Sequence, residues 1–190
     1  MTAKKAPSKR VSDRTTPRAS VFVGTSVDGF IARKDGGLDF LPADGGEPHG
    51  YDEFIESVDA IVVGRKTFET VQSFDEWPYG NRTVVVLSTT LREVRVPKGA
   101  VCEVMQGPPS KVVAHLAKRG VKHIYVDGGV TIQGFLRAGL VQRLTITRVP
   151  VLIGSGVPLF GELLKDVRLQ HVATTSYPSG LVKTEYRVLR

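Results

Sequence analysis

Two short apolar runs, far apart in the chain, each end in glycine and lead into a helical pattern. The first is residues 60–64 (AIVVG), followed by Arg65 and Lys66, and the second is residues 123–129 (HIYVDGG). Such a junction directs free backbone N–H groups and the positive end of a helix dipole beyond the strand. In open α/β sheets, ligands bind at that edge. The alternative is that both glycines only make turns, but two such junctions, one with two cations, predict a site for a phosphate-bearing nucleotide.

The two cations indicate which nucleotide to expect. Arg65 presents a fork of donors to a phosphate, and Lys66 supplies a point charge. Together with Ser88 or Thr89 they could recognise a 2′-phosphate, which favours NADPH over NADH. The alternative is a solvated helix start, but cations at a helix N-terminus cost about 0.3–1 kcal/mol unless an anion is present. We therefore expect an NADPH site, with the Gly128-Gly129 pair approaching the pyrophosphate or simply forming a tight turn.

Reduction of a C=N or C=O bond also needs a proton donor beside the substrate. Asp127 ends an apolar strand next to the expected pyrophosphate, so it either faces the substrate or accepts hydrogen bonds from the turn. Leu41-Pro42-Ala43-Asp44 resembles a segment of dihydrofolate reductases, which use one acid on the helix after their mobile loop, and this resemblance implies Asp44, Asp52 or Glu53 as the other candidates. Each of these is also an ordinary residue for a solvated loop or helix start. We expect the catalytic acid among these four residues and no metal site.

The elements that must position these residues alternate between strand and helix. Apolar runs predict strands near 20–24, 60–63, 83–87, 101–104, 123–126 and 141–149, and helical spacing predicts helices at 51–58, from 67, at 110–118 and at 130–138. A long loop is expected over 33–50, and two alternating runs near 167–174 and 181–188 predict a hairpin. The predicted fold class is α/β, with a mixed, mainly parallel central sheet flanked by helices and a C-terminal antiparallel hairpin.

Several segments resemble a known family. Residues 61–69, 86–89 and 127–129 resemble the cofactor-binding segments of dihydrofolate reductases, and 25–32 resembles the start of their mobile loop. Ser26-x-Asp28-Gly29, residues 138–141 and the run 150–160 resemble more narrowly the reductase domain of riboflavin-pathway deaminase–reductases and its stand-alone relatives. The resemblance covers residues 20–190 and implies a dihydrofolate-reductase-like fold.

The resemblance also implies an activity and a set of site residues. The expected activity is NADPH-dependent reduction of a pyrimidine or pterin-type heterocycle, most narrowly that of a 5-amino-6-(5-phosphoribosylamino)uracil reductase. The alternatives are a dihydrofolate or dihydropterin reductase, disfavoured by the glycines after Asp44, and a nucleotide-binding regulatory protein without catalysis. Because the loop 150–160 is apolar, we expect it to pack against a second subunit, giving a homodimer, or else against its own sheet. The residues expected to bind the cofactor are Thr25, Ile31, Gly64, Arg65, Lys66, Thr67, Leu87, Ser88, Thr89, Gly128, Gly129, Val130 and Thr131.

Composition limits the remaining function classes. The net charge of the 190-residue chain is +7, and residues 1–18 carry six basic residues against one acidic residue, Asp13. We expect a disordered basic tail over 1–18 and a single reductase-like domain over 19–190. No aromatic residues interleave the tail's charges, so nucleic-acid binding is not expected. The single cysteine, Cys102, and the lack of a signal peptide or membrane-spanning run predict a cytoplasmic protein.

Overall fold

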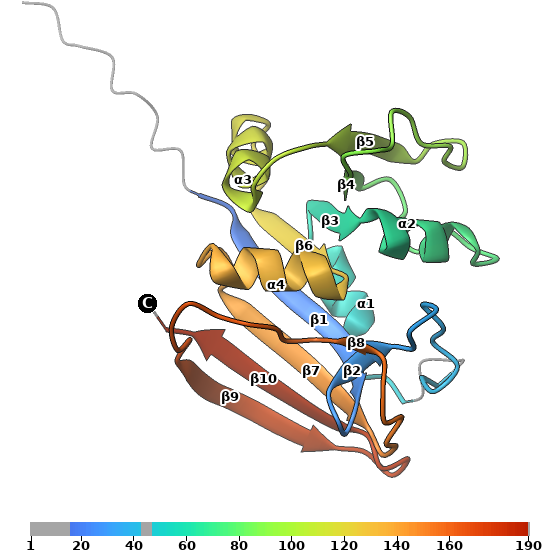
Figure 1. Cartoon of the computed structure of the whole chain (residues 1–190), viewed down its shortest axis with the longest axis vertical. Helices are drawn as coiled ribbons and strands as arrows, with labels where there is room; N and C mark the ends of the chain where they lie inside the picture. Colours follow the sequence, from blue (N-terminus) through green and yellow to red (C-terminus); the bar gives the residue numbers. More distant parts are fainter. Residues whose placement is uncertain (1–15, 43–46, 190) are drawn as a thin grey trace, which may run out of the picture.

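The computed structural model describes residues 16–42 and 47–189, which form one large sheet with helices on both faces (Figure 1). The strand order is β5-β4-β3-β6-β1-β7-β10-β9, and a separate two-stranded sheet pairs β2 with β8. The strands are β1 (Arg18–Ser26), β2 (Phe30–Ala32), β3 (Ala60–Gly64), β4 (Thr83–Leu87), β5 (Val101–Met105), β6 (His123–Asp127), β7 (Arg143–Val149), β8 (Val157–Pro158), β9 (Leu169–Ser176) and β10 (Val182–Val188). The helices are α1 (Tyr51–Glu56), α2 (Arg65–Gln72), α3 (Pro109–Lys118) and α4 (Gly129–Arg137).

The predicted fold class is confirmed. Strands β5, β4, β3, β6, β1 and β7 are parallel neighbours, while β10 runs antiparallel to both β7 and β9. The carboxyl ends of β1, β3, β4 and β6 therefore lie along one edge, as the sequence predicted. The first strand starts at Arg18, the last residue of the predicted basic tail, and residues 1–15 of that tail lie outside the described part of the chain.

Two apolar layers hold the helices on opposite faces of the sheet. Alternate residues of the strands point to each face, so Val62 and Val126 pack with α3 and α4, while Ile61 and Tyr125 pack with α1 and α2. Figure 1 shows α4 and α1 on opposite sides of β1. Because the central strands are covered on both faces, their sequences are continuously apolar rather than alternating.

Helix α2 begins at Arg65, two residues before the predicted start at Thr67. Gly64 is its N-cap in an extended conformation, with φ −82° and ψ 165°, and Phe68 and Val71 bury the inner face. The two cations therefore lie in the first turn itself, where no acidic residue offsets them.

Strands β1 and β6 separate toward the carboxyl edge. Their pairing ends at Ser20 and Tyr125, although β1 continues to Ser26 on its other neighbour, β7. The Tyr125 hydroxyl donates a hydrogen bond of 2.9 Å to the carbonyl oxygen of Phe22, which has no partner on β6. A gap between parallel strands thus opens next to the end of β6, where Asp127 lies.

The segment 150–160 folds partly onto its own domain. Strand β8 pairs with β2, and Leu159 is buried in the apolar layer beneath α4. The carboxylate of Asp28 accepts hydrogen bonds from the backbone N–H groups of Ile153 (3.3 Å) and Gly154 (2.8 Å). These contacts attach the segment to residues 25–32. Within the described residues, no helix has the length and apolar character needed to cross a membrane.

Candidate active site

The two predicted glycine junctions lie against each other. Gly128 has φ +89°, and a Cβ added to it would overlap the hydroxyl of Thr67, the third residue of α2. A Cβ on Gly64 would lie 3.0 Å from the hydroxyl oxygen of Thr131, the third residue of α4. Each threonine therefore occupies the space that the other junction's glycine leaves open. This reciprocal packing, the glycine–threonine lock, places the N-termini of α2 and α4 side by side.

The paired helix starts are suited to an anion. Neither α2 nor α4 has a side-chain cap or an acidic residue in its first turn, so their first N–H groups have no such partner. The small β2–β8 sheet lies next to them, because a Cβ on Gly129 would press on Val157 (2.9 Å) and approach Ile31 (3.4 Å). A pyrophosphate at these termini would gain N–H donors and the positive ends of two helix dipoles.

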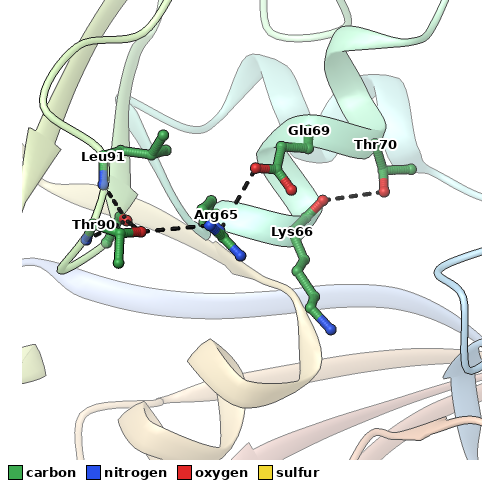
Figure 2. A network of polar contacts seen from close by, with 7 residues as sticks. Arg65, Lys66, Glu69, Thr70, Thr90 and Leu91 are labelled. Carbon is green, nitrogen blue, oxygen red and sulfur yellow. Dashed lines mark hydrogen bonds and ion pairs between the residues drawn. The ribbon is translucent and has the colours of Figure 1, made fainter.

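A cavity of about 410 Å³ opens at the ends of β4 and β5, next to Arg65. The Arg65 guanidinium donates through Nη1 to the Thr90 hydroxyl at 3.5 Å and pairs with Glu69 at 3.6 Å (Figure 2). Figure 2 also shows the Lys66 side chain pointing away from Arg65 and Glu69. The residues that line the cavity are Arg65, Leu87, Ser88, Thr89, Thr90, Met105, Gln106 and Gly107.

The Ser88 hydroxyl organises the loop that closes this cavity. Its oxygen accepts hydrogen bonds from the backbone N–H groups of Leu91 (3.0 Å) and Thr90 (3.2 Å), and it lies 3.3 Å from the Thr90 hydroxyl. Thr90 therefore links Ser88 to Arg65. The guanidinium, about half exposed and held by one weak ion pair, remains available to a phosphate.

Asp127 ends β6 with its carboxyl group beside the gap between β6 and β1. Its Oδ1 accepts the Gly128 N–H at 2.7 Å. Burial raises the pKa of the Asp127 carboxyl, and this effect outweighs the opposing hydrogen bonds from Gly128 and Tyr125. A carboxyl group in this state retains its proton to a higher pH than an exposed aspartate, which suits a proton donor.

Aromatic side chains fill the same face of the sheet next to Asp127. Phe22 stacks on Phe54 of α1 at 4.9 Å between ring centroids, and Phe54 meets the ring of Tyr125 edge-on at 5.1 Å. Burial and then the nearby Asp127 charge raise the pKa of Tyr51 to about 12. These rings provide an apolar floor beside Asp127, which is itself partly exposed.

Of the other predicted site residues, some lie in the core, some lie at the surface, and one is outside the described part of the chain. Asp52 and Glu53 are exposed in the first turn of α1, where acidic residues suit the helix dipole, and Asp44 lies outside the described residues. Thr25 is buried in β1, and Val130 is 78% exposed at the start of α4. Within the described part of the chain, no group of three or more histidine, cysteine, aspartate or glutamate residues is arranged to hold a metal ion.

Sequence reasoning missed several residues around the cavity next to Arg65. Thr90, Met105, Gln106 and Gly107 line it; Met105 ends β5, and Gln106 and Gly107 lie in the turn between β5 and α3. Gly107 has φ +119°, so the Gly107-Pro108 pair was the available signal for a turn at this position.

The family assignment follows from comparison with known proteins. Residues 17–183 match the family model of the RibD C-terminal domain, so the chain belongs to that family. A proposed riboflavin biosynthesis protein from Shewanella sp. PV-4 is 38% identical, with 91% of this chain and 99% of that chain aligned and a TM-score of 0.83. These two matches confirm the resemblance inferred from the sequence motifs.

Two more distant structures share the fold. The deaminase/5-amino-6-(5-phosphoribosylamino)uracil reductase of Thermotoga maritima is 16% identical with a TM-score of 0.74, covering 92% of this chain and 57% of that one. Dihydrofolate reductase from Enterococcus faecalis, complexed with NADP(H), is 20% identical with a TM-score of 0.65, covering 92% of this chain and 98% of that one. The dihydrofolate-reductase-like fold is therefore confirmed.

The glycine–threonine lock predicts a specific loss of stability. Gly128→Ala should lower the free energy of unfolding by about 1–3 kcal/mol, because alanine is strained at positive φ and its methyl group overlaps Thr67. The matched control is Gly139→Ala, which also has positive φ but no atom within 4 Å of the added Cβ. Urea unfolding should show the larger loss for Gly128→Ala. Equal losses for the two variants would contradict the lock.

Proposed function

We propose that the protein is an NADPH-dependent reductase of a pyrimidine-type heterocycle, acting on 5-amino-6-(5-phosphoribosylamino)uracil or a close relative of it. Membership of the RibD C-terminal domain family supports an oxidoreductase. The observation that carries the proposal is the arrangement along one sheet edge of the Arg65 cavity, the paired helix N-termini and the half-buried Asp127, whose carboxyl pKa is raised.

The described residues fit NADPH in three places. Arg65, with the Ser88 and Thr90 hydroxyls, faces a cavity large enough for an adenosine 2′-phosphate. The glycines of the lock allow close approach of the pyrophosphate to the two helix starts. The nicotinamide ring would lie beside Asp127, where β1 and β6 no longer pair. When bound, NADPH supplies the hydride.

Asp127 is the proposed source of the accompanying proton. Reduction of a C=N or C=O bond places a hydride on carbon and a proton on nitrogen or oxygen. Burial raises the pKa of the Asp127 carboxyl, so this group retains its proton to a higher pH than an exposed aspartate does. The backbone N–H of Gly128 fixes the carboxyl orientation. Asp52 and Glu53, exposed on α1, stay candidates for a supporting role.

Cofactor choice should depend on Arg65. Removing the charge-assisted contact in Arg65→Ala should weaken NADPH binding by about 1.5–3 kcal/mol, or roughly 10- to 150-fold, while NADH binding stays nearly constant. Fluorescence titration of the reduced nicotinamide measures both affinities. The control is Arg137→Ala, which removes the same charge from the exposed end of α4. Equal binding of NADPH and NADH, unaffected by Arg65→Ala, would refute the 2′-phosphate site.

Asp127→Asn should separate catalysis from stability. The variant keeps the acceptor for Gly128 but cannot donate a carboxyl proton, so NADPH oxidation with 5-amino-6-(5-phosphoribosylamino)uracil should fall by roughly 100-fold or more. Parallel assays with dihydrofolate and a dihydropterin test the alternative substrates. If the parent protein oxidises NADPH with none of the three compounds, the non-catalytic alternative holds.

The same substitution should stabilise the fold at neutral pH. The pKa of Asp127 is higher in the folded protein than in the unfolded chain, where it is about 3.9. At any pH above that unfolded-chain pKa, ionisation of Asp127 therefore lowers the free energy of unfolding. The loss of unfolding free energy reaches its full size only when the pH is above the folded-state pKa of Asp127. It disappears when the pH falls below the pKa of Asp127 in the unfolded chain. Thermal unfolding should therefore show Asp127→Asn more stable than the parent at pH 7.5 and much less so at pH 4, whereas Asp75→Asn, at an exposed site, shows no such change.

We also propose a homodimer formed through the segment after β7. Although Leu159 is buried within its own domain, Leu152 is 72% exposed, Phe160 46% and Leu164 94%. Apolar side chains gathered in one segment are suited to contact with a second copy of the chain. Light scattering at micromolar concentration should give the mass of two chains, and Leu152→Lys combined with Leu164→Lys should reduce it to one. A monomeric parent would contradict the proposal.

A further inference from the structure

Three arginines form a row across adjacent strands at the amino edge of the sheet, the edge opposite Asp127. Arg143 begins β7 and pairs directly with Arg187, near the end of β10 (Figure 1). Arg18 begins β1, two residues before Ser20, which pairs with Arg143 on its other side. All three residues of this arginine row are exposed. The proposed reductase chemistry leaves the row without a role.

The three side chains lie on the same face of the sheet. Leu144 and Tyr186 pack in the apolar layer of α3 and α4. The arginines that precede and follow them on β7 and β10 therefore point to the opposite face, because successive side chains of a strand alternate. On that face the Nη2 of Arg18 lies 3.1 Å from the Nδ1 of His123, whose ring meets Phe54 of α1 edge-on. The row therefore presents its charges on the face that carries α1.

The arginine row is unfavourable in the protein alone. Like charges directly opposite each other on antiparallel strands are destabilising, and Arg143 and Arg187 form such a pair. Within the described part of the chain, none of the ion pairs involves the row; the cations that have carboxylate partners there are Arg33, Arg65, His115, Arg119 and Lys183. An anionic ligand would supply the partners that the described residues do not.

The titration of a neighbouring histidine reports the positive charge of this edge. Burial lowers the pKa of His123, and the charges of Arg18 and Arg143 lower it further. Asp59 opposes this effect, but its carboxylate already accepts the backbone N–H groups of Lys122 at 2.8 Å and His123 at 2.9 Å. Asp59 is therefore occupied by the turn before β6, and the row keeps its positive charge.

The extent of the row indicates a polyanion rather than a small ligand. The row crosses β1, β7 and β10, whose spacing is about 4.8 Å per strand, and exposed guanidinium groups in such a line can each meet a different phosphate. Small ligands bind instead in concave, mostly apolar pockets. The sequence that leads into β1 adds five cations and one acid, namely Lys4, Lys5, Lys9, Arg10, Arg14 and Asp13.

We propose that the arginine row, together with the cations of residues 1–15, binds the phosphate backbone of double-stranded nucleic acid regardless of base sequence. Residues 1–18 have no aromatic side chain for the base stacking that single strands use, but backbone contact needs none. They also contain no Leu, Ile, Phe or Trp to anchor them in a membrane surface. The row thus revises the expectation, drawn from the sequence alone, that no nucleic acid binds.

The test is Arg143→Gln combined with Arg187→Gln, measured by fluorescence anisotropy with a labelled DNA duplex of about 20 base pairs. At about 50 mM salt the double variant should bind the duplex roughly tenfold more weakly than the parent. Its slope of log affinity against log salt should fall by roughly 1.8, since each phosphate contact contributes about 0.9. Its melting temperature should be equal or higher, because a like-charge pair is removed.

The matched control is Arg92→Gln combined with Arg148→Gln, which also removes two exposed charges, one of them from the other end of β7. Its affinity and salt slope should stay close to those of the parent. Failure of the parent to bind the duplex at about 50 mM salt would overturn the proposal, as would equal losses in the two double variants. Tighter binding to a single strand, or to vesicles of phosphatidylserine and phosphatidylcholine, than to the duplex would also overturn it. Because none of these measurements depends on turnover, the result is separate from the proposed reductase activity.

Discussion

The site depends on how closely two strand-to-helix junctions can pass each other. Gly64 and Gly128 end neighbouring parallel strands, and the third residue of each following helix packs on the glycine of the other junction. Any larger side chain at Gly128 would push α2 and α4 apart. With both helix starts together, their free N–H groups and dipoles converge on one point of the sheet edge. The unfavourable placement of Arg65 and Lys66 in the first turn of α2 is then understandable, because a bound phosphate would offset it.

The second constraint is the separation of β1 from β6. Pairing stops at Ser20 and Tyr125, and the Tyr125 hydroxyl takes over the Phe22 carbonyl that would otherwise lack a partner. This arrangement opens the sheet without leaving a buried carbonyl unpaired, and it sets Asp127 in a position where burial raises its pKa. The fold therefore gives up some stability at Asp127, where the proposed reaction would take place.

The fold was largely predictable from the sequence, and the site only in part. Strands β3, β4 and β6 are covered on both faces, so their continuous apolar runs were clear signals. The positions of Arg65, Ser88 and the glycine pair at the sheet edge were also predictable, because these residues directly follow such strands. Thr90 and Gln106 lie in loops whose approach to Arg65 depends on tertiary packing.

The most direct test of the central claim is amide hydrogen exchange with and without NADPH. The N–H groups at the starts of α2 and α4 lack intrahelical acceptors, so they should exchange rapidly in the free protein and slow together when a pyrophosphate binds them. We expect NADPH-dependent protection in residues 65–67, 88–91 and 129–131, and weaker protection by NADH in residues 88–91. Absence of protection at both helix starts under saturating NADPH, or protection at only one of them, would contradict it.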